Sequence, residues 1–228
     1  MKDLSYIPDY EELLVVHSLK ELLNFKFNTA SRINTVIFPR ELAGDFNGLA
    51  QKIKLLGSGY WEQFNLFSLK IPHLTRQEKQ ARKHIQSDIR AINNYCEPSL
   101  TDKFQEVDIQ YSPLSQAYFW HIDGTIETEE SEDRKQKETE RYFISYTAAC
   151  TQFVKNSDAT KRQLKNFMIA LKPDAKPWSP QCGDIVKFRM GNNVPNETNF
   201  AIHNMPIWQT SLPRLFYSRD NSYPLGPT

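Results

Sequence analysis

The second half of this chain consists of short runs of β-branched and aromatic residues, and this pattern limits the folds it can adopt. Turn residues separate the runs, among them Pro113, Gly124, Gly183, Gly191 and Pro206. The runs cover residues 107–111, 115–122, 141–148, 184–189, 199–203 and 213–218. Many short strands without an intervening helical pattern are typical of a sandwich or a barrel. We therefore expect residues 106–228 to form a β-rich core.

The first half follows a mainly helical pattern and is expected to support that core. Apolar residues recur at helical spacing over 9–25 and 41–56, and Thr75 with Glu78 forms a capping-box signature that opens a third helix. Two short runs, 34–38 and 67–71, each precede a proline and indicate strands. Residues 160–171 fit a helix or a strand equally well. The chain is thus expected to be a single α+β domain over 1–228, with residues 1–105 as a mainly helical layer.

Length and composition leave room for one well-packed globular domain. The chain has 228 residues and a net charge of +1, so no global charge draws it toward nucleic acid or a membrane. Cys96, Cys150 and Cys182 are widely spaced and form no Cys-x-x-Cys pair, which suits three reduced thiols. The sequence contains no signal-peptide pattern and no apolar run of the roughly 18 residues that span a bilayer. We expect a cytoplasmic protein.

One segment interrupts the strand-like pattern. Residues 127–141 (ETEESEDRKQKETER) are almost wholly charged and directly follow the run that contains His121. We expect a charged loop over 125–141. Such a segment is either a solvated loop or a mobile lid that orders over a substrate, since lids need low intrinsic stability.

His121 and Asp123 are the first pair of residues that could bind a metal. A His-x-Asp pair alone is expected by chance in a chain of this composition, but here it lies at the end of a predicted strand. Residues two apart on a strand point to the same face, so both side chains could bind one ion. The competing interpretation is that His121 and His203 are ordinary, partly buried histidines.

Two further residues extend this pair into a larger set. His203 ends a later predicted strand, and Arg214 opens the next one. Two imidazoles and one carboxylate leave half of a metal's coordination sphere open, and an arginine fork suits a carboxylate. A hairpin-like return would place Arg214 on a strand adjacent to His203, with Phe216 and Ser218 on the same face. The competing interpretation of Arg214 is a surface ion-pair residue.

In order and spacing, these residues resemble the iron(II)/2-oxoglutarate-dependent dioxygenase superfamily over about residues 107–220. The resemblance implies a double-stranded β-helix (jelly-roll) core, with His121, Asp123 and His203 as the iron(II) ligands. It implies that Arg214 binds the distal carboxylate of 2-oxoglutarate, with Tyr146 or Ser145 as further contacts. The partners would then be 2-oxoglutarate, O2 and an unidentified primary substrate that is hydroxylated or demethylated.

The chain also departs from the superfamily pattern. Some subfamilies carry Ser or Thr two positions after the arginine, where this chain has Phe216. Nucleic-acid demethylases carry a second arginine six positions on, whereas Arg219 lies five after Arg214 and would face the opposite side of a strand. This disfavours nucleic acid as the substrate. Two other functions stay open: a cupin-like metalloenzyme that does not use 2-oxoglutarate, and a non-enzymatic binding protein on a degenerate barrel.

Overall fold

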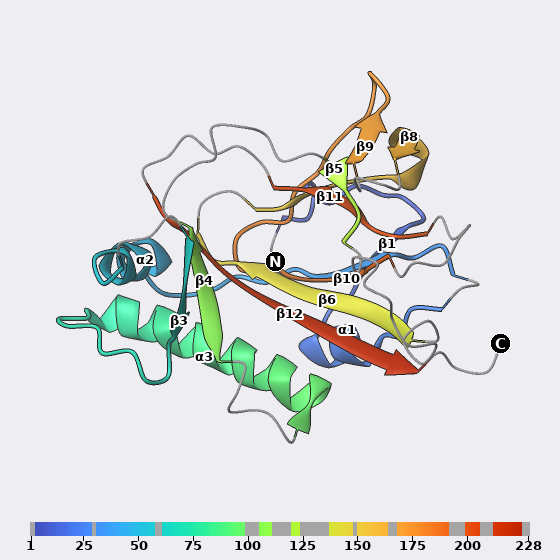
Figure 1. Ribbon diagram of the computed structural model, residues 1–228. Coiled ribbons are helices and arrows are strands. Elements are labelled where there is room, and N and C mark those ends of the chain that lie inside the picture. The colour runs from blue at the N-terminus through green and yellow to red at the C-terminus, as the bar shows by residue number, and fades with distance from the viewer. Residues whose placement is uncertain are drawn as a thin grey trace.

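The computed structural model combines α-helices with two β-sheets, which confirms the α+β class (Figure 1). The structure describes residues 3–28, 31–57, 61–98, 105–110, 120–123, 137–147, 150–163, 168–191, 199–205 and 212–224. Within these ranges the three α-helices are α1 (Leu19–Asn24), α2 (Phe46–Lys54) and α3 (Arg76–Cys96). All three belong to the first half of the chain, as the sequence predicts.

Side chains of the helix caps explain where these helices begin. The Thr75 hydroxyl accepts a hydrogen bond from the Glu78 N–H, and the Glu78 carboxylate accepts one from the Thr75 N–H, which is a complete capping box. The helix predicted to start at Thr75 is therefore confirmed. The Asp45 carboxylate caps α2 by accepting from the Gly48 N–H, so this helix begins five residues after the predicted Glu41.

The helix predicted over residues 9–25 is only partly correct. The segment divides into a strand, β1 (Leu13–Val15), and the short helix α1, whose first turn is capped by Ser18. β1 pairs in parallel with β2 (Thr35–Phe38), so pairing with a neighbouring strand overrides the local helical spacing of its apolar residues.

The larger sheet has seven strands and carries the helices on one face. Its order is β1-β2-β10-β6-β12-β4-β3, and apart from the β1–β2 pair the neighbours are antiparallel. The remaining strands are β10 (Ile185–Arg189), β6 (Lys137–Ser145), β12 (Arg214–Pro224), β4 (Glu106–Gln110) and β3 (Trp61–Asn65). Figure 1 shows α3 running beneath this sheet, and their contact buries the largest apolar cluster.

The smaller sheet faces the other side of the larger one. Its order is β7-β11-β5-β9-β8. The strands are β7 (Gln152–Val154), β11 (Ile202–Asn204), β5 (Trp120–His121), β9 (Met168–Leu171) and β8 (Ala159–Gln163). The described residues of the ambiguous stretch 160–171 thus belong to a strand pair. A second apolar cluster includes Phe143 and Phe216 from the larger sheet and Phe153 from the smaller one, so the two sheets share a core.

Successive strands alternate between the two sheets from β4 onward. β4, β6, β10 and β12 belong to the larger sheet, whereas β5, β7 and β11 belong to the smaller one. The intervening pair β8–β9 extends the smaller sheet at its edge. The chain therefore crosses from one layer to the other after nearly every strand.

Most of the predicted strands are found, with differences at their ends. The runs 107–111, 141–148, 184–189, 199–203 and 213–218 correspond to β4, β6, β10, β11 and β12, and of 115–122 the described part forms β5. The strand predicted over 67–71 is wrong, because the Asn65 side chain accepts hydrogen bonds from the Phe67 and Ser68 N–H groups and turns the chain there. From Lys137 the charged segment 127–141 belongs to β6, and residues 124–136 lie outside the described ranges.

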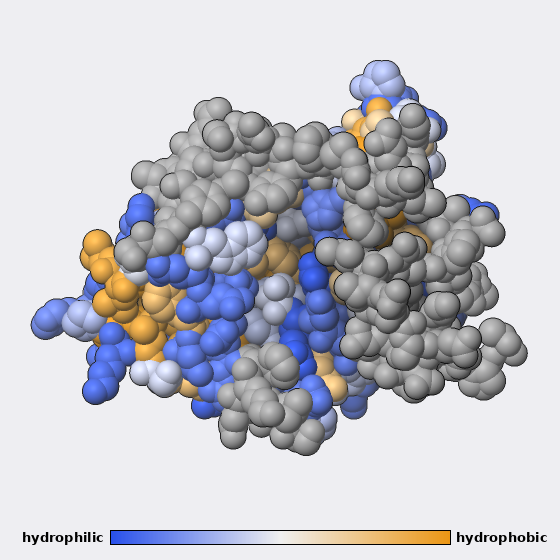
Figure 2. Space-filling model, in the orientation of Figure 1, coloured by the Kyte–Doolittle hydropathy of each residue, from blue (hydrophilic) through white to orange (hydrophobic). Residues whose placement is uncertain are grey.

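The face of the molecule drawn in Figure 2 carries polar side chains together with apolar areas. Figure 2 shows apolar atoms at the side of the molecule where α2 lies in Figure 1, and Leu55, just after this helix, is 83% exposed. Among the described residues, no helix has the length and apolar character needed to cross a bilayer.

Candidate metal centre

Pairing of β5 with β11 places two histidines side by side. His121 and His203 are directly opposite each other in the antiparallel register. Their ring centroids are 4.4 Å apart and the rings are tilted by 55°. The side chain of His203 is 8% exposed and that of His121 is 29% exposed, so the pair lies at the border between core and solvent.

Asp123 completes a three-residue cluster with these histidines. Its Oδ2 lies 3.1 Å from His203 Nε2, and its Oδ1 lies 3.5 Å from His121 Nε2. One ligand atom from each of the three residues lies within 4.8 Å of the others. The structure therefore brings together the set predicted from the sequence, and its two nitrogens and one carboxylate oxygen are a donor set that suits iron(II).

The surroundings of His203 hold its ring in a fixed orientation. Its Nδ1 lies 3.3 Å from the Ala201 carbonyl oxygen, and its ring packs against Phe188 and Phe153. Metal-binding histidines commonly donate their second ring N–H to a backbone carbonyl, which leaves the other nitrogen for the metal. The contact with Ala201 therefore directs Nε2 toward Asp123.

The backbone of Asp123 is held by a neighbouring glycine. The Gly191 N–H donates to the Asp123 carbonyl oxygen over 2.7 Å. A Cβ atom at Gly191 would lie 2.8 Å from Ile122 Cγ2, which is too close for ordinary contact. A larger residue at position 191 would therefore have to displace the Ile122 side chain, and the Gly191 hydrogen bond positions the His121–Asp123 segment.

Arg141 on β6 connects the cluster to a second carboxylate. Its guanidinium pairs with Asp123 Oδ2 through Nη1 and with Asp220 through Nε and Nη2, at 2.5 and 2.9 Å. Burial alone would raise the pKa of Asp123, but His203, His121 and Arg141 together hold it well below its usual range. Asp123 is therefore ionised, as a metal ligand must be. Arg141 is not among the site residues expected from the sequence, although its alternation with Phe143 and Ser145 on the strand indicates the same face.

Arg214 lies buried on the inner face of the larger sheet. It is 1% exposed, and its guanidinium carbon lies 4.6 Å from the ring centroid of Phe216 and 5.3 Å from that of Phe143. Its Nη2 donates to the Thr151 hydroxyl over 3.0 Å. Burial lowers the pKa of Arg214 to about 10, so the side chain is charged at neutral pH in an apolar setting. A surface ion-pair role for Arg214 does not fit this burial.

The placement of Arg214 relative to His203 differs from the prediction. The expected hairpin would have made their strands neighbours, but β11 and β12 belong to different sheets. The shared face of Arg214 and Phe216 is confirmed by the stacking of the guanidinium on the ring. Arg219 pairs with Glu97, just beyond α3, so the odd offset does turn it to the opposite face.

The two further contacts expected around Arg214 are Ser145, the last residue of β6, and Tyr146, the residue after it, and they point to opposite sides of the larger sheet. Ser145 is 3% exposed and pairs in register with Phe216, on the face that carries Arg214. Among the described residues its hydroxyl has no partner with normal hydrogen-bond geometry, although it is close enough to lower the pKa of the Cys150 thiol. Tyr146 instead donates to Asp88 on α3 over 2.9 Å and packs with the helices. The structure thus places Ser145, but not Tyr146, on the same face as Arg214.

Comparisons with known proteins find distant structural neighbours. No family model and no curated protein matches the chain. It is similar to the epimerase SnoN in complex with Fe3+, alpha ketoglutarate and nogalamycin RO (16% identity, 82% of this chain and 78% of that chain, TM-score 0.38). It is also similar to OsALKBH1 (9% identity, covering 81% of this chain and 96% of that chain, TM-score 0.37). A third neighbour is the viral collagen prolyl hydroxylase vCPH of Paramecium bursaria Chlorella virus-1 with 2OG (14% identity, covering 70% of this chain and 93% of that chain, TM-score 0.32).

The three residues that the sequence resemblance implies as metal ligands come together in the structure. Because the TM-scores of these neighbours are below 0.5, we base the functional assignment on this chain's own residues.

Proposed function

We propose that this protein is a non-haem iron(II)- and 2-oxoglutarate-dependent oxygenase. The observation that carries the proposal is the convergence of His121, Asp123 and His203, whose ligand atoms lie within 4.8 Å of one another. Three protein ligands on one side of an ion leave the other side open for a cosubstrate and O2.

We propose further that the two sheets form a double-stranded β-helix. The alternation of β4, β5, β6, β7, β10, β11 and β12 between the sheets supports this topology, since a jelly roll is built from two sheets that share the strands of one chain in this way. The isolated bridge from Phe153 on β7 to Trp178 adds an outer member to the smaller sheet. The metal ligands then lie on the smaller sheet and Arg214 on the larger one.

The residues around Arg214 fit the distal carboxylate of 2-oxoglutarate. The guanidinium offers paired N–H donors, and the Thr151 and Ser145 hydroxyls belong to residues that are 6% and 3% exposed. Phe143 and Phe216 exclude water from this position, so a charged hydrogen bond would gain strength there. Thr147 supports the site by accepting from the Leu215 N–H and donating to the Pro213 carbonyl, which holds both neighbours of Arg214.

In this assignment, iron(II) with 2-oxoglutarate supplies the activation of O2 that hydroxylates or demethylates a primary substrate. The protein contributes orientation and a partly dry site. His203 is held by the Ala201 carbonyl, Asp123 by the Gly191 N–H, and Arg214 by the Thr151 hydroxyl. Arg219 is occupied by Glu97 on the other face of β12, which supports our expectation that nucleic acid is not the substrate.

Anaerobic titration of iron(II) and 2-oxoglutarate into the metal-free protein tests the proposal. We expect one iron site and a weak visible charge-transfer band that forms only when both are present. His121→Ala should abolish iron binding and the band. His17→Ala, a change at an exposed histidine just before the N-cap of α1, is the matched control and should retain both.

Each other outcome indicates a different function. Iron binding without the band, insensitive to Arg214→Ala, would replace the proposal with a cupin-like metalloenzyme that does not use 2-oxoglutarate. No iron binding by the wild-type protein would refute both enzymes and leave a binding protein on a degenerate barrel.

A further inference from the structure

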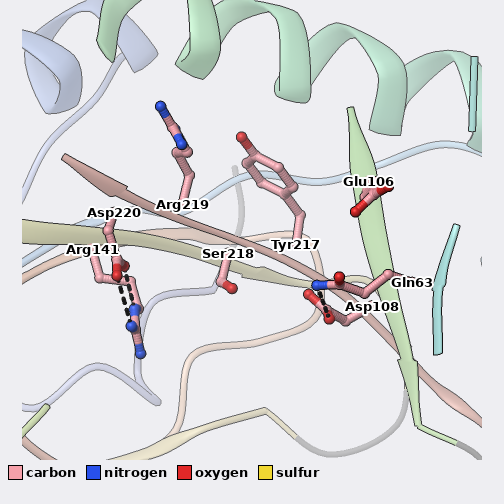
Figure 3. Close-up of a pocket in the computed structure, with 8 residues that line it drawn as sticks. All are labelled: Gln63, Glu106, Asp108, Arg141, Tyr217, Ser218, Arg219 and Asp220. Carbon is pink, nitrogen blue, oxygen red and sulfur yellow. Dashed lines mark hydrogen bonds and ion pairs between the residues drawn. The ribbon is translucent and has the colours of Figure 1, made fainter. Parts of the chain in front are cut away.

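A polar pocket of about 240 Å³ lies against the strands of the larger sheet (Figure 3). β3 contributes Gln63, β4 contributes Glu106 and Asp108, β6 contributes Arg141, and β12 contributes Tyr217 to Asp220. Its volume is below the roughly 300–1,000 Å³ of sites for drug-sized ligands. It therefore has room for one small group, such as an amino-acid side chain or an alkylamine.

Arg141 joins this pocket to the candidate metal centre. One part of its guanidinium pairs with Asp220 in the pocket, and another part pairs with Asp123. Figure 3 shows the two contacts between Arg141 and Asp220 as the guanidinium lies along the carboxylate. A ligand in the pocket would thus be one side chain away from a metal ligand.

The charges that line the pocket favour a cation. Arg141 is engaged by the carboxylates of Asp220 and Asp123, and Arg219 pairs with Glu97 on the far side of the sheet. Figure 3 accordingly shows Arg219 pointing away from Asp108 and Gln63. The carboxylates of Asp108 and Glu106, two positions apart on β4, leave excess negative charge on this wall.

Asp108 is held in one orientation by donors on one of its oxygens. Oδ1 accepts hydrogen bonds from Trp61 Nε1 at 2.9 Å and from Gln63 Nε2 at 3.0 Å. Among the described residues no donor reaches Oδ2, although the residue is 7% exposed. The negative charge of Asp108 helps to raise the pKa of Arg141, and it opposes the lowering of the Arg214 pKa by burial. A buried carboxylate with one anchored and one open oxygen is preorganised to bind a donor, because little side-chain entropy is left to lose.

We propose that this pocket binds a small organic cation, a primary ammonium or guanidinium group of the primary substrate, through Asp108 and Glu106. The identification of that cation as part of the primary substrate rests on the proposed oxygenase function. The binding itself does not, since it needs neither iron nor 2-oxoglutarate.

A ligand-observed NMR titration of the metal-free, full-length protein tests this directly. The probes are n-butylammonium, its neutral analogue n-butanol and the anion butyrate. We expect saturable binding of n-butylammonium alone. Asp108→Asn should weaken it by about tenfold or more, the cost of losing one charged hydrogen bond. Asp174→Asn makes the same charge change at an exposed carboxylate outside the pocket and should leave the affinity unchanged.

Glu106→Gln provides a second test, because Glu106 is exposed and its replacement spares the core. Glu106→Gln should weaken n-butylammonium binding by a smaller factor than Asp108→Asn. If Asp108→Asn does not fold, the affinity of Glu106→Gln alone tests the proposed site. Equal binding of butyrate or n-butanol would overturn the proposal. So would unchanged n-butylammonium affinity in both variants. If Asp108→Asn binds n-butylammonium as the wild type does but binds 2-oxoglutarate differently, Asp108 is instead a counter-ion of Arg214.

Discussion

Replacing Arg214 by methionine should separate stability from cosubstrate binding. Methionine fills a similar apolar space between Phe143 and Phe216 but carries no charge. In the protein without cosubstrate, the buried guanidinium is an energetic cost, because burial lowers its pKa from the ordinary 12.5 to about 10. This shift corresponds to about 3 kcal/mol at neutral pH. Much of that cost should be relieved in Arg214→Met.

The expected result is therefore an unchanged or increased free energy of unfolding together with a large loss of 2-oxoglutarate affinity. Removing one partner of a buried, hydrogen-bonded charge pair costs about 2–5 kcal/mol, which is roughly 30-fold to several-thousand-fold in Kd. Arg214→Met also loses the hydrogen bond to Thr151, which should lower the free energy of unfolding by about 1 kcal/mol.

Two measurements on the same samples check this. Urea denaturation gives the free energy of unfolding, and calorimetric titration of 2-oxoglutarate into iron-loaded, anaerobic protein gives the Kd. Arg76→Met, at an exposed position of α3, controls for the loss of one positive charge. A variant that loses more than about 2 kcal/mol of stability yet binds 2-oxoglutarate as before would show that Arg214 is structural, and the reasoning would fail.

Three further predictions concern the support of the site. Asp88 pairs with both Arg40 Nη atoms at 2.6 and 2.5 Å and accepts a hydrogen bond from the Tyr146 hydroxyl. Asp88→Asn should therefore lower the free energy of unfolding, measured by urea denaturation, by about 3–5 kcal/mol. The surface control Asp174→Asn should lower it by less than about 0.5 kcal/mol. The Sγ atoms of Cys150 and Cys182 are 3.6 Å apart, so hydrogen peroxide should join them by removing two hydrogens, and mass spectrometry finding only Cys96 oxidised would contradict this. Burial raises the pKa of Cys96 to about 12. As the pH rises, the thiol therefore loses its proton in the unfolded state before it does so in the folded state, and the free energy of unfolding should fall above about pH 9. The fall should be smaller in Cys96→Ala. Parallel curves of unfolding free energy against pH for the two proteins would exclude this thiol as the cause.

The parts of the fold that sequence predicted best are those with a local cause. The capping box of Thr75 and Glu78 fixes the start of α3, and the alternation of residues in β4, β10 and β12 identifies these strands. Residues 9–25 were misread because Leu13 and Leu14 satisfy a helical spacing as well as a strand. Ser18 followed by Glu21 was the available signal for a later helix start, since the Ser18 hydroxyl caps α1. The single-domain organisation over residues 1–228 stays a prediction.

The candidate metal ligands could be predicted because they are close in register and alternate predictably. His121 ends β5 and Asp123 follows two residues later, and the β5–β11 pairing then brings in His203. The choice between Ser145 and Tyr146 also had a local answer: adjacent residues on a strand point to opposite faces, so only one could lie beside Arg214. Arg141 and Asp108 were missed because their roles depend on contacts between distant segments, with Asp123 and Asp220 in one case and with Trp61 and Gln63 in the other.

The most direct test of the central claim is a crystal structure of the anaerobic protein with iron(II) and 2-oxoglutarate. We predict one metal ion bound by His121 Nε2, His203 Nε2 and an Asp123 carboxylate oxygen, with the distal carboxylate of 2-oxoglutarate on the Arg214 guanidinium. Metal bound elsewhere, or 2-oxoglutarate absent from Arg214 while iron occupies the triad, would contradict the account.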